Sequence, residues 1–249
     1  MTSLRLPRRG ALAGSAALLV GASFGPARAA PVGPWAVELF TSQGCSSCPP
    51  ADRVLGGLAR RDDIVALSFH VNYWDYIGWK DPFASAPLTE RQRSYARMLK
   101  QRYVYTPEMV FDGRAHEPGT SANEVDDMVE AMRRRAMVRA TPRLERTADG
   151  ALTVALEDYK LEQTAEVTLA VYDRRHTTPV PRGENTGATL DNFNVVRRLE
   201  KVAQWDGKAA GWTIPADRFA AGQGAAVLVQ IADHGAMLGC NKLESATAG

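Results

Sequence analysis

Two of the chain's three cysteines are separated by only two residues, and their setting constrains the fold around them. The apolar run WAVELFT at residues 35–41 is typical of a buried strand, and a Pro-Pro pair directly follows Cys48. Proline is tolerated in the first turn of a helix, where backbone N–H groups have no partner within the helix. We therefore expect a strand, then Cys45 and Cys48, then a helix over about residues 49–60.

A cysteine just before a helix is expected to be reactive. The unpaired N–H groups and the partial positive charge at a helix N-terminus favour thiolate over thiol, which lowers the pKa of the cysteine. On this geometry Cys45 is the predicted nucleophile that attacks a disulfide, and Cys48 is the thiol that resolves the mixed disulfide. Both are therefore predicted catalytic residues of a redox dithiol.

Two other interpretations of the cysteine pair remain open. One is an inert structural disulfide, and the other is half of a copper or zinc site with His70 as a further ligand. A zinc site needs about four ligands, but the chain has no second C-x-x-C and its four histidines are scattered. We therefore expect neither a bound metal nor another cofactor.

The segments that follow the dithiol alternate between strand and helix patterns. Residues 64–73 are typical of a second strand, and the stretch rich in Trp, Asp and Pro at 74–87 predicts an irregular loop. A capping-box pattern predicts a helix from Thr89 to about residue 102. A strand over 107–111 precedes an Asp-Gly turn signal, and a second capping box at Ser121 predicts another helix.

This order of elements resembles the thioredoxin fold: strand, C-x-x-C, helix, strand, helix, Thr-Pro, strand and Gly. In that fold the proline at this place is in cis and packs beside the dithiol, and the residue before it offers backbone groups to an extended substrate. The resemblance implies that Thr106 and Pro107 bind substrate and that their peptide bond is cis. The alternative is a trans proline that opens an edge strand, since trans is the commoner form of X–Pro bonds.

A carboxylate lies in the first predicted strand, between Val37 and Leu39. Thioredoxin-like proteins often place a buried carboxylate on this strand, under the resolving cysteine, where a raised pKa lets it exchange protons with a thiol. The resemblance therefore implies Glu38 as a catalytic residue. If Val37 and Leu39 face the core, however, Glu38 faces the other way, and a salt-bridged or solvated glutamate is the alternative.

Polar and aromatic side chains gather at the end of the second predicted strand and in the loop after it. They are His70, Asn72, Tyr73, Trp74, Asp75, Tyr76 and Trp79. In a parallel sheet this end lies on the same side as the end of the first strand, near Cys45. An aromatic rim suits an extended peptide or a small apolar ligand, so Tyr73 and Trp74 are predicted substrate-binding residues. Alternatively, the tryptophans pack the joint between two domains.

The second half of the chain has a different pattern. Apolar residues alternate in short runs such as AEVTLAVY at 165–172, and strong helix signals are absent. The expected fold class is therefore an α/β thioredoxin-like domain at residues 30–142, with an insertion at about 74–102, followed by a mostly β, sandwich-like domain at 143–249. We expect Cys240 to be buried and inert, the alternatives being an intermolecular disulfide or a third redox thiol.

The first 29 residues have the three parts of a secretory signal peptide. Arginines near the start precede a short apolar stretch, and an A-x-A cleavage signal ends at Ala29. The Arg8-Arg9 pair is also compatible with twin-arginine export. We therefore expect a periplasmic or secreted protein.

Processing would also change the charge of the chain. Cleavage after Ala29 removes four arginines and no acid, so the formal charge falls from +2 to about −2, which does not favour a nucleic-acid partner. No later segment has the run of about 18 apolar residues that a membrane span needs. We therefore expect no nucleic-acid partner and no membrane span in the mature protein.

Four runs of the sequence together resemble one specific family. They are VELFTSQGCSSCPPAD at 37–52, FHVNYWDYIGWKDPF at 69–83, YTPEMVFDG at 105–113 and GENTGATLDNFNVVR at 183–197. The chain is similar to an uncharacterised secreted family with a thioredoxin-like domain and a C-terminal β extension, known only as a domain of unknown function. The resemblance implies export and a thioredoxin-like fold, and it implies no substrate.

Taken together, these features predict a periplasmic or secreted thiol–disulfide oxidoreductase. Its substrates would be protein thiols and disulfides, and an unidentified redox partner would recycle it. One alternative is a non-catalytic protein that binds a peptide or partner and keeps Cys45–Cys48 as a structural disulfide. The other is the copper- or zinc-handling protein considered above. A titration against glutathione distinguishes catalysis from structure, because structural disulfides have potentials below about −300 mV.

Overall fold

The computed structural model describes residues 33–135 and 138–244 of the chain. The expected signal peptide lies outside this described part. Among the described residues, no helix is long and apolar enough to cross a membrane. The elements in chain order are β1 Trp35–Thr41, α1 Pro49–Leu58, β2 Ile64–His70, the short 3-10 helix η1 Asp75–Ile77, α2 Ala86–Met98, β3 Glu108–Phe111, β4 Ala115–Glu117, α3 Ala122–Arg134, β5 Arg143–Arg146, β6 Leu152–Leu156, β7 Ala165–Pro179, β8 Thr189–Trp205, β9 Ala210–Ile214, η2 Ala216–Arg218, β10 Gln223–Ile231 and β11 Met237–Leu243.

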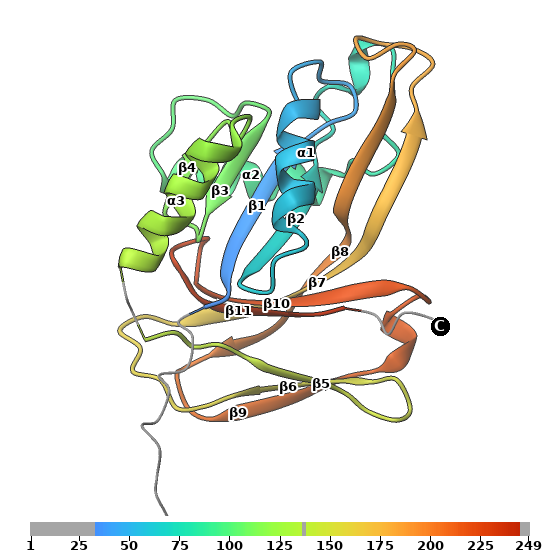
Figure 1. Cartoon of the computed structure of the whole chain (residues 1–249). Coiled ribbons are helices and arrows are strands. Elements are labelled where there is room, and N and C mark those ends of the chain that lie inside the picture. Colours follow the sequence, from blue (N-terminus) through green and yellow to red (C-terminus); the bar gives the residue numbers. More distant parts are fainter. Residues whose placement is uncertain (1–32, 136–137, 245–249) are drawn as a thin grey trace, which may run out of the picture. The chain divides into compact units, whose positions relative to one another are not determined.

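An eight-stranded mixed sheet runs through the molecule in the order β11-β10-β7-β8-β2-β1-β3-β4 (Figure 1). Strand β2 pairs in parallel with β1 and with β8, whereas the other neighbouring strands are antiparallel. A second sheet has the order β5-β6-β9. The parallel β1-α1-β2 unit is the part of the sheet that carries the cysteine pair.

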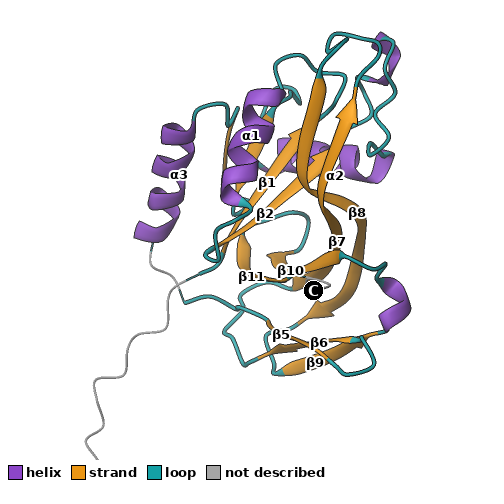
Figure 2. Ribbon diagram, turned by 45° about the vertical axis from the view of Figure 1, so that its right-hand side comes forward, coloured by secondary structure: helices purple, strands orange, loops and turns teal. Residues whose placement is uncertain are grey.

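Helices cover both faces of the sheet around β1 (Figure 2). Side chains alternate between the two faces of a strand. Val37 and Leu39 accordingly share an apolar core with residues of α1 and α3. Ala36 and Phe40 point to the opposite face, where they share a core with residues of α2. Strand β1 is therefore buried on both sides, and the parity of each residue decides which helix it meets.

The small sheet packs on the far end of the large one. Leu152 and Val154 of β6 share an apolar core with Val167 of β7 and Val227 of β10. All the regular elements described after residue 142 are strands apart from the short η2. Strand β8 nevertheless lies beside β2 in the large sheet, so residue 142 does not mark an edge of the hydrogen-bonded sheet. Residues on both sides of it belong to one compact unit.

Local signals locate most helix ends correctly. Helix α1 begins at Pro49 as predicted, and Ser121 is the N-cap of α3, accepting a hydrogen bond from the Glu124 N–H. The predicted start of α2 at Thr89 is wrong, because the helix begins three residues earlier with Ser85 as its N-cap. The Thr89 hydroxyl instead bonds to the side chain of Asn72, so it joins α2 to the loop after β2.

Candidate active site

The loop between β1 and α1 carries the cysteine pair. Cys45 and Cys48 form a disulfide with 5.5 Å between their Cα atoms, and Cys48 is the N-cap of α1. The predicted position at a strand-to-helix junction is therefore confirmed. Both cysteines are buried, at 1% and 0% exposure, although Ser46 and Ser47 between them are exposed.

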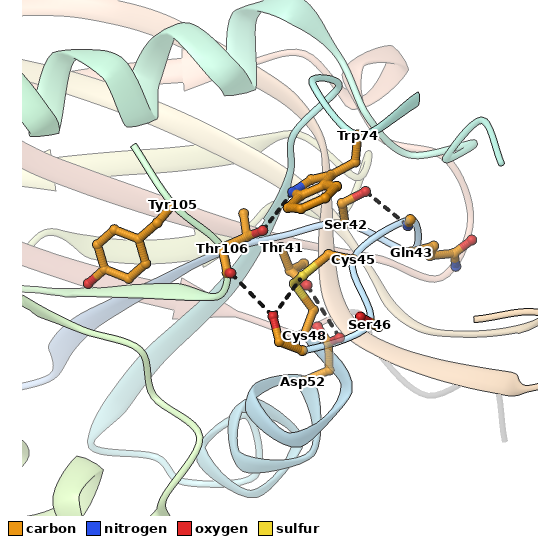
Figure 3. The surroundings of a disulfide bond; sticks show 12 residues. Thr41, Ser42, Gln43, Cys45, Ser46, Cys48, Asp52, Trp74, Tyr105 and Thr106 are labelled. Atoms are coloured by element: carbon orange, nitrogen blue, oxygen red, sulfur yellow. Dashed lines mark hydrogen bonds between the residues drawn. A yellow bond between two sulfur atoms is a disulfide. The ribbon is translucent and has the colours of Figure 1, made fainter. Parts of the chain in front are cut away.

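The segment before β3 lies against this loop (Figure 3). The peptide bond between Thr106 and Pro107 is cis, as predicted. The Ser47 hydroxyl lies 3.3 Å from the Cys45 sulfur and 3.5 Å from the Thr106 carbonyl oxygen. The structure therefore brings Thr106, a predicted substrate-binding residue, next to the cysteine pair.

The two predicted aromatic contacts have different surroundings. Trp74 donates its indole N–H to the Thr106 hydroxyl at 2.7 Å and lies beside the cysteine pair (Figure 3). A side chain at Gly44 would place a Cβ 3.1 Å from the Trp74 Cβ, so the glycine allows this close approach. Tyr73 instead donates to Gln92 of α2, and burial raises its pKa to about 12. Trp74 is thus the aromatic residue that bonds to Thr106, and Tyr73, next to it in the same loop, joins that loop to α2.

Glu38 lies on the face of β1 that packs against α2, not the face that packs against α1. It accepts hydrogen bonds from the Arg91 guanidinium at 2.5 and 2.9 Å and from the Tyr95 hydroxyl at 2.5 Å. The side chain shares the parity of Ala36 and Phe40, since successive residues point to opposite faces. The structure therefore corresponds to the salt-bridged alternative for Glu38, and it does not place this carboxylate under the dithiol.

A different carboxylate, Asp52, lies below the dithiol. Its backbone N–H donates to the Cys48 carbonyl at 3.1 Å, and its side chain points from α1 toward the cysteine loop (Figure 3). It accepts a hydrogen bond from the Thr41 hydroxyl at 3.3 Å, and the Asn192 side chain lies close enough to lower its pKa. Burial, opposed by the charge of His70, raises the pKa of Asp52 to about 7. This carboxyl can therefore exchange a proton near neutral pH.

A buried polar network continues from Asp52 across the sheet. His70 of β2 is the register neighbour of Thr41, and its Nδ1 lies 2.7 Å from a carboxylate oxygen of Asp81. Burial raises the pKa of Asp81, but the charge and hydrogen bond of His70 outweigh it and lower the pKa overall. Asp81 also accepts the backbone N–H of Gln43 at 2.8 Å. The network therefore fixes the loop that leads into Cys45.

The second half of the chain reaches this loop through the first residues of β8 and through the turn between β7 and β8. Asn192 accepts a hydrogen bond from the Gln43 side chain at 2.9 Å. Asn185 donates to the carbonyl oxygens of Gln43 and Cys45 at 2.9 and 3.0 Å. Glu184 accepts from the backbone N–H and the hydroxyl of Ser46 at 3.2 and 2.8 Å. The site is therefore built from both halves of the sequence.

Cys240 lies on β11 and is fully buried. Its thiol donates to the Pro34 carbonyl at 3.2 Å, and burial raises its pKa far above the usual range. A thiol held protonated is a poor nucleophile. The expected burial is confirmed. In residues 33–135 and 138–244, no three His, Cys, Asp or Glu side chains are grouped so that they could hold a metal ion.

Several site residues were absent from the sequence-based prediction. Asp52 follows Cys48 by four residues, a spacing that places two helical residues on one face, so the sequence held a signal for it. Glu184 and Asn185 lie in a run that the sequence singled out, but nothing local links that run to the dithiol. Their contacts depend on the pairing of β7, β8 and β2.

This chain is similar in sequence and fold to known proteins. The model of a family described as "Protein of unknown function (DUF1223)" matches residues 36–230. A search of curated proteins finds no match. The crystal structure of protein AGR_C_4864 from Agrobacterium tumefaciens is similar, with 32% identity over 87% of this chain and 96% of that chain and a TM-score of 0.76. HBP35 of Porphyromonas gingivalis has a TM-score of 0.56 at 12% identity, over 86% of this chain and 77% of that chain, which is a likeness of fold alone.

Proposed function

The chain belongs to the DUF1223 family of proteins of unknown function, and we propose from its own site that it catalyses thiol–disulfide exchange through Cys45 and Cys48. The observation that carries this proposal is the position of the disulfide at the start of α1, beside the Thr106 carbonyl. A helix N-terminus favours the thiolate that exchange requires. The Thr106 backbone is the group that a thioredoxin-like site offers to an extended substrate.

The arrangement of the first half supports a thioredoxin-like fold as part of the same proposal. Strand β1 lies between a parallel neighbour, β2, and an antiparallel neighbour, β3. Helices α1 and α3 pack on one face of β1, and α2 packs on the other. This arrangement resembles the thioredoxin fold in both strand order and helix placement. The long β7–β8 hairpin and the small sheet are additions to it.

The proposed reaction has two steps. The Cys45 thiolate attacks a substrate disulfide, forming a mixed disulfide and releasing one substrate thiolate. The Cys48 thiol then loses its proton and attacks the Cys45 sulfur, which releases the second substrate thiol and leaves the Cys45–Cys48 disulfide. The protein dithiol loses two electrons and the substrate disulfide gains them. The same steps in reverse oxidise a substrate dithiol.

We assign the proton transfer at Cys48 to Asp52. Its buried carboxyl has a pKa raised to about 7 by burial, so it is able to take a proton from a thiol at neutral pH. Glu38 is less suited to this role, because it forms an ion pair with Arg91 on the other face of β1. Asp52 therefore takes the place that sequence reasoning gave to Glu38.

The proposal includes the setting in which this chemistry is useful. Disulfide exchange on secreted proteins takes place outside the cytoplasm, and the first 29 residues have the pattern of an export signal. We therefore propose a periplasmic or secreted protein that acts on protein thiols and disulfides and is recycled by a separate redox partner.

One observation favours a second candidate function. Both cysteines are at most 1% exposed in the disulfide form, as expected of a structural bond in a non-catalytic binding protein. A catalytic dithiol with this burial needs a movement that uncovers Cys45. The two candidates differ in whether a substrate disulfide can reach the reduced pair.

A trapping experiment with a defined substrate tests the proposal. Reduced protein is mixed with a disulfide-linked peptide pair and followed by mass spectrometry. We expect the unaltered protein to reduce the peptide, Cys48→Ala to accumulate a mixed disulfide at Cys45, and Cys45→Ala to form little adduct. Equal adduct formation by both variants, or by neither, would contradict the proposed roles.

A further inference from the structure

The loop that carries the disulfide is hydrogen-bonded to a part of the chain that comes from the other half of the sequence. Ser46 and Ser47 are exposed, whereas the two cysteines that flank them are buried. On one side the cover consists of Trp74 and Thr106 (Figure 3). On another side the turn between β7 and β8 lies beside the same loop (Figure 1).

Two adjacent residues of this turn hold the cysteine loop by its polar atoms. The Asn185 amide donates to the carbonyl oxygens of Gln43 and Cys45 at 2.9 and 3.0 Å. One oxygen of Glu184 accepts the Ser46 N–H at 3.2 Å and the Ser46 hydroxyl at 2.8 Å. These four hydrogen bonds tie the turn to the loop on both sides of Cys45.

The turn also packs against the loop that follows η1. Gly183 has a φ of +83°, and a Cβ at this position would lie 3.0 Å from the Trp79 Cβ. Trp79 in turn donates its indole N–H to the Gln43 side chain at 3.2 Å. The glycine thus permits both the left-handed backbone and the close packing on the loop after η1.

The charge of Glu184 has a chemical consequence for the dithiol. Backbone N–H groups near a thiolate stabilise it, and the Ser46 N–H, in the loop before α1, directly follows Cys45 in the chain. Glu184 occupies the N–H of Ser46, the residue that follows Cys45. A carboxylate at this place competes for a nearby donor and adds a like charge close to Cys45, and a like charge disfavours the thiolate.

Other ionisable side chains lie near the dithiol from the elements packed around it. They are Asp52 on α1, His70 on β2 and Asp81 after η1. Glu38 on β1 accepts a hydrogen bond from Arg91 of α2. Glu108 on β3 accepts hydrogen bonds from Gln92 of α2 and from Gln101. The turn itself carries the exposed cation Arg182 and the exposed carboxylate Glu184, and Glu184 is the one that bonds to the segment between the cysteines.

We propose that the β7–β8 turn is a cover of the dithiol, in which Asn185 holds the cover closed and Glu184 is a positioning residue that disfavours the Cys45 thiolate. The inference rests on the proposed function and adds a control element to it. A substrate polypeptide reaches Cys45 by displacing the turn. The carboxylate makes the reduced form less stable, so the dithiol is a weaker oxidant than it would be without Glu184.

Two variants separate the cover from the charge. Glu184→Gln keeps an oxygen that accepts from Ser46 and removes the charge, whereas Asn185→Ala removes two donated hydrogen bonds and keeps the charge. Matched controls are Glu162→Gln and Asn123→Ala, both at exposed positions away from the dithiol. Each variant of the full chain is measured for the rate at which dithiothreitol reduces the disulfide. In that reaction the protein gains two electrons and two protons, and dithiothreitol becomes its cyclic disulfide.

The reduced proteins are then alkylated with iodoacetamide from pH 5 to 9, which gives the pKa of the Cys45 thiol. We expect Asn185→Ala to be reduced about five- to thirtyfold faster, because one or two hydrogen bonds of ordinary strength no longer hold the cover. We expect Glu184→Gln to label Cys45 about three- to tenfold faster below its pKa, since a nearby like charge is gone. At equilibrium with glutathione, a larger fraction of Glu184→Gln than of the unaltered protein should be in the reduced form.

The outcomes distinguish this inference from the proposed function. If the unaltered protein exchanges with glutathione but both variants match their controls, the cover and the charge effect are wrong while the proposed function stands. If Asn185→Ala also moves the alkylation profile as far as Glu184→Gln does, the turn acts only as a structural support. If the unaltered protein does not exchange at all, the proposed function itself fails.

Discussion

Two buried carboxylates near the cysteines differ because of their partners. Glu38 faces Arg91, whose guanidinium forms two hydrogen bonds with it, so its charge is compensated. Asp52 has no cationic side chain bonded to it, and its polar neighbours are the neutral Thr41 hydroxyl and Asn192 side chain. Burial disfavours a charge without a compensating partner. Asp52 is therefore the carboxyl whose proton is mobile at neutral pH.

The raised pKa of Asp52 predicts a pH dependence of stability. Its pKa is about 7 in the folded protein, against 3.8 as the ordinary value. Between these values the folded state binds a proton that the unfolded state has lost, so stability decreases as pH rises from about 4 to about 7. We expect Asp52→Asn to remove this dependence. From pH 4 to pH 8, the free energy of unfolding of this variant should therefore rise by at most about 4 kcal/mol relative to that of the unaltered protein.

Urea unfolding of the oxidised proteins at pH 4 and pH 8 measures this difference. Asp62→Asn serves as the control, because that carboxylate is exposed. A stability difference between Asp52→Asn and the unaltered protein that is the same at both pH values would contradict the assignment of a raised pKa.

At the scale of elements, the Glu38–Arg91 pair joins β1 to α2. Tyr95 of α2 donates to Glu38, and Gln230 of β10 accepts from Arg91 at 3.2 Å, so the pair also reaches a strand of the second half. A buried pair of this kind is costly to break because the remaining charge has no partner. Its role in the structure is therefore to fix these elements together.

Substitution of Glu38 should therefore change the free energy of unfolding in the opposite direction from substitution of Asp52. We expect Glu38→Gln to lower the free energy of unfolding by about 3 to 5 kcal/mol, since it leaves Arg91 uncompensated. The same change should leave the pH profile of Cys45 alkylation unaltered in the folded protein. Glu90→Gln on the exposed side of α2 is the control and should have little effect on stability. An altered alkylation profile in Glu38→Gln would restore Glu38 as a proton relay.

The elements also show what the sequence could predict and why the rest was out of reach. The strand-to-helix junction at Cys48 and the N-cap at Ser121 depend on local backbone chemistry, and both were predicted. For Glu38 the sequence left a relay and an ion pair open, because it indicates the parity of β1 but not which helix covers each face. The contacts of Glu184 required the pairing of β2 with β8, which joins residues more than a hundred positions apart.

The whole molecule is organised by the sheet that both halves share. The core on the α2 side of β1 includes Phe40 and Phe69 from the first half together with Tyr172 and Val196 from the second. Strand β8 covers the edge of β2 that would otherwise be free. An uncovered edge strand and a divided core both weaken a fold. The two halves of the sequence therefore depend on each other for stability.

This dependence predicts the behaviour of the first half alone. We expect a polypeptide of residues 30–142 to lack a cooperative unfolding transition, because it loses the β8 partner of β2 and seven of the sixteen buried residues of that core. Near-ultraviolet circular dichroism and urea unfolding of this fragment, with residues 30–249 as the reference, provide the measurement. A cooperative transition of the fragment would instead support an independent thioredoxin-like domain.

The central claim is that Cys45 and Cys48 form a dithiol that exchanges with partners, and its redox potential tests this most directly. The protein is equilibrated with glutathione buffers of graded ratio, quenched with acid, alkylated and counted for free thiols by mass. We expect a two-electron equilibrium for this pair at a potential between about −120 and −270 mV, the range of catalytic dithiols, with Cys240 remaining reduced throughout. A pair that stays oxidised at every ratio, with a potential below about −300 mV, would contradict the claim and identify a structural disulfide.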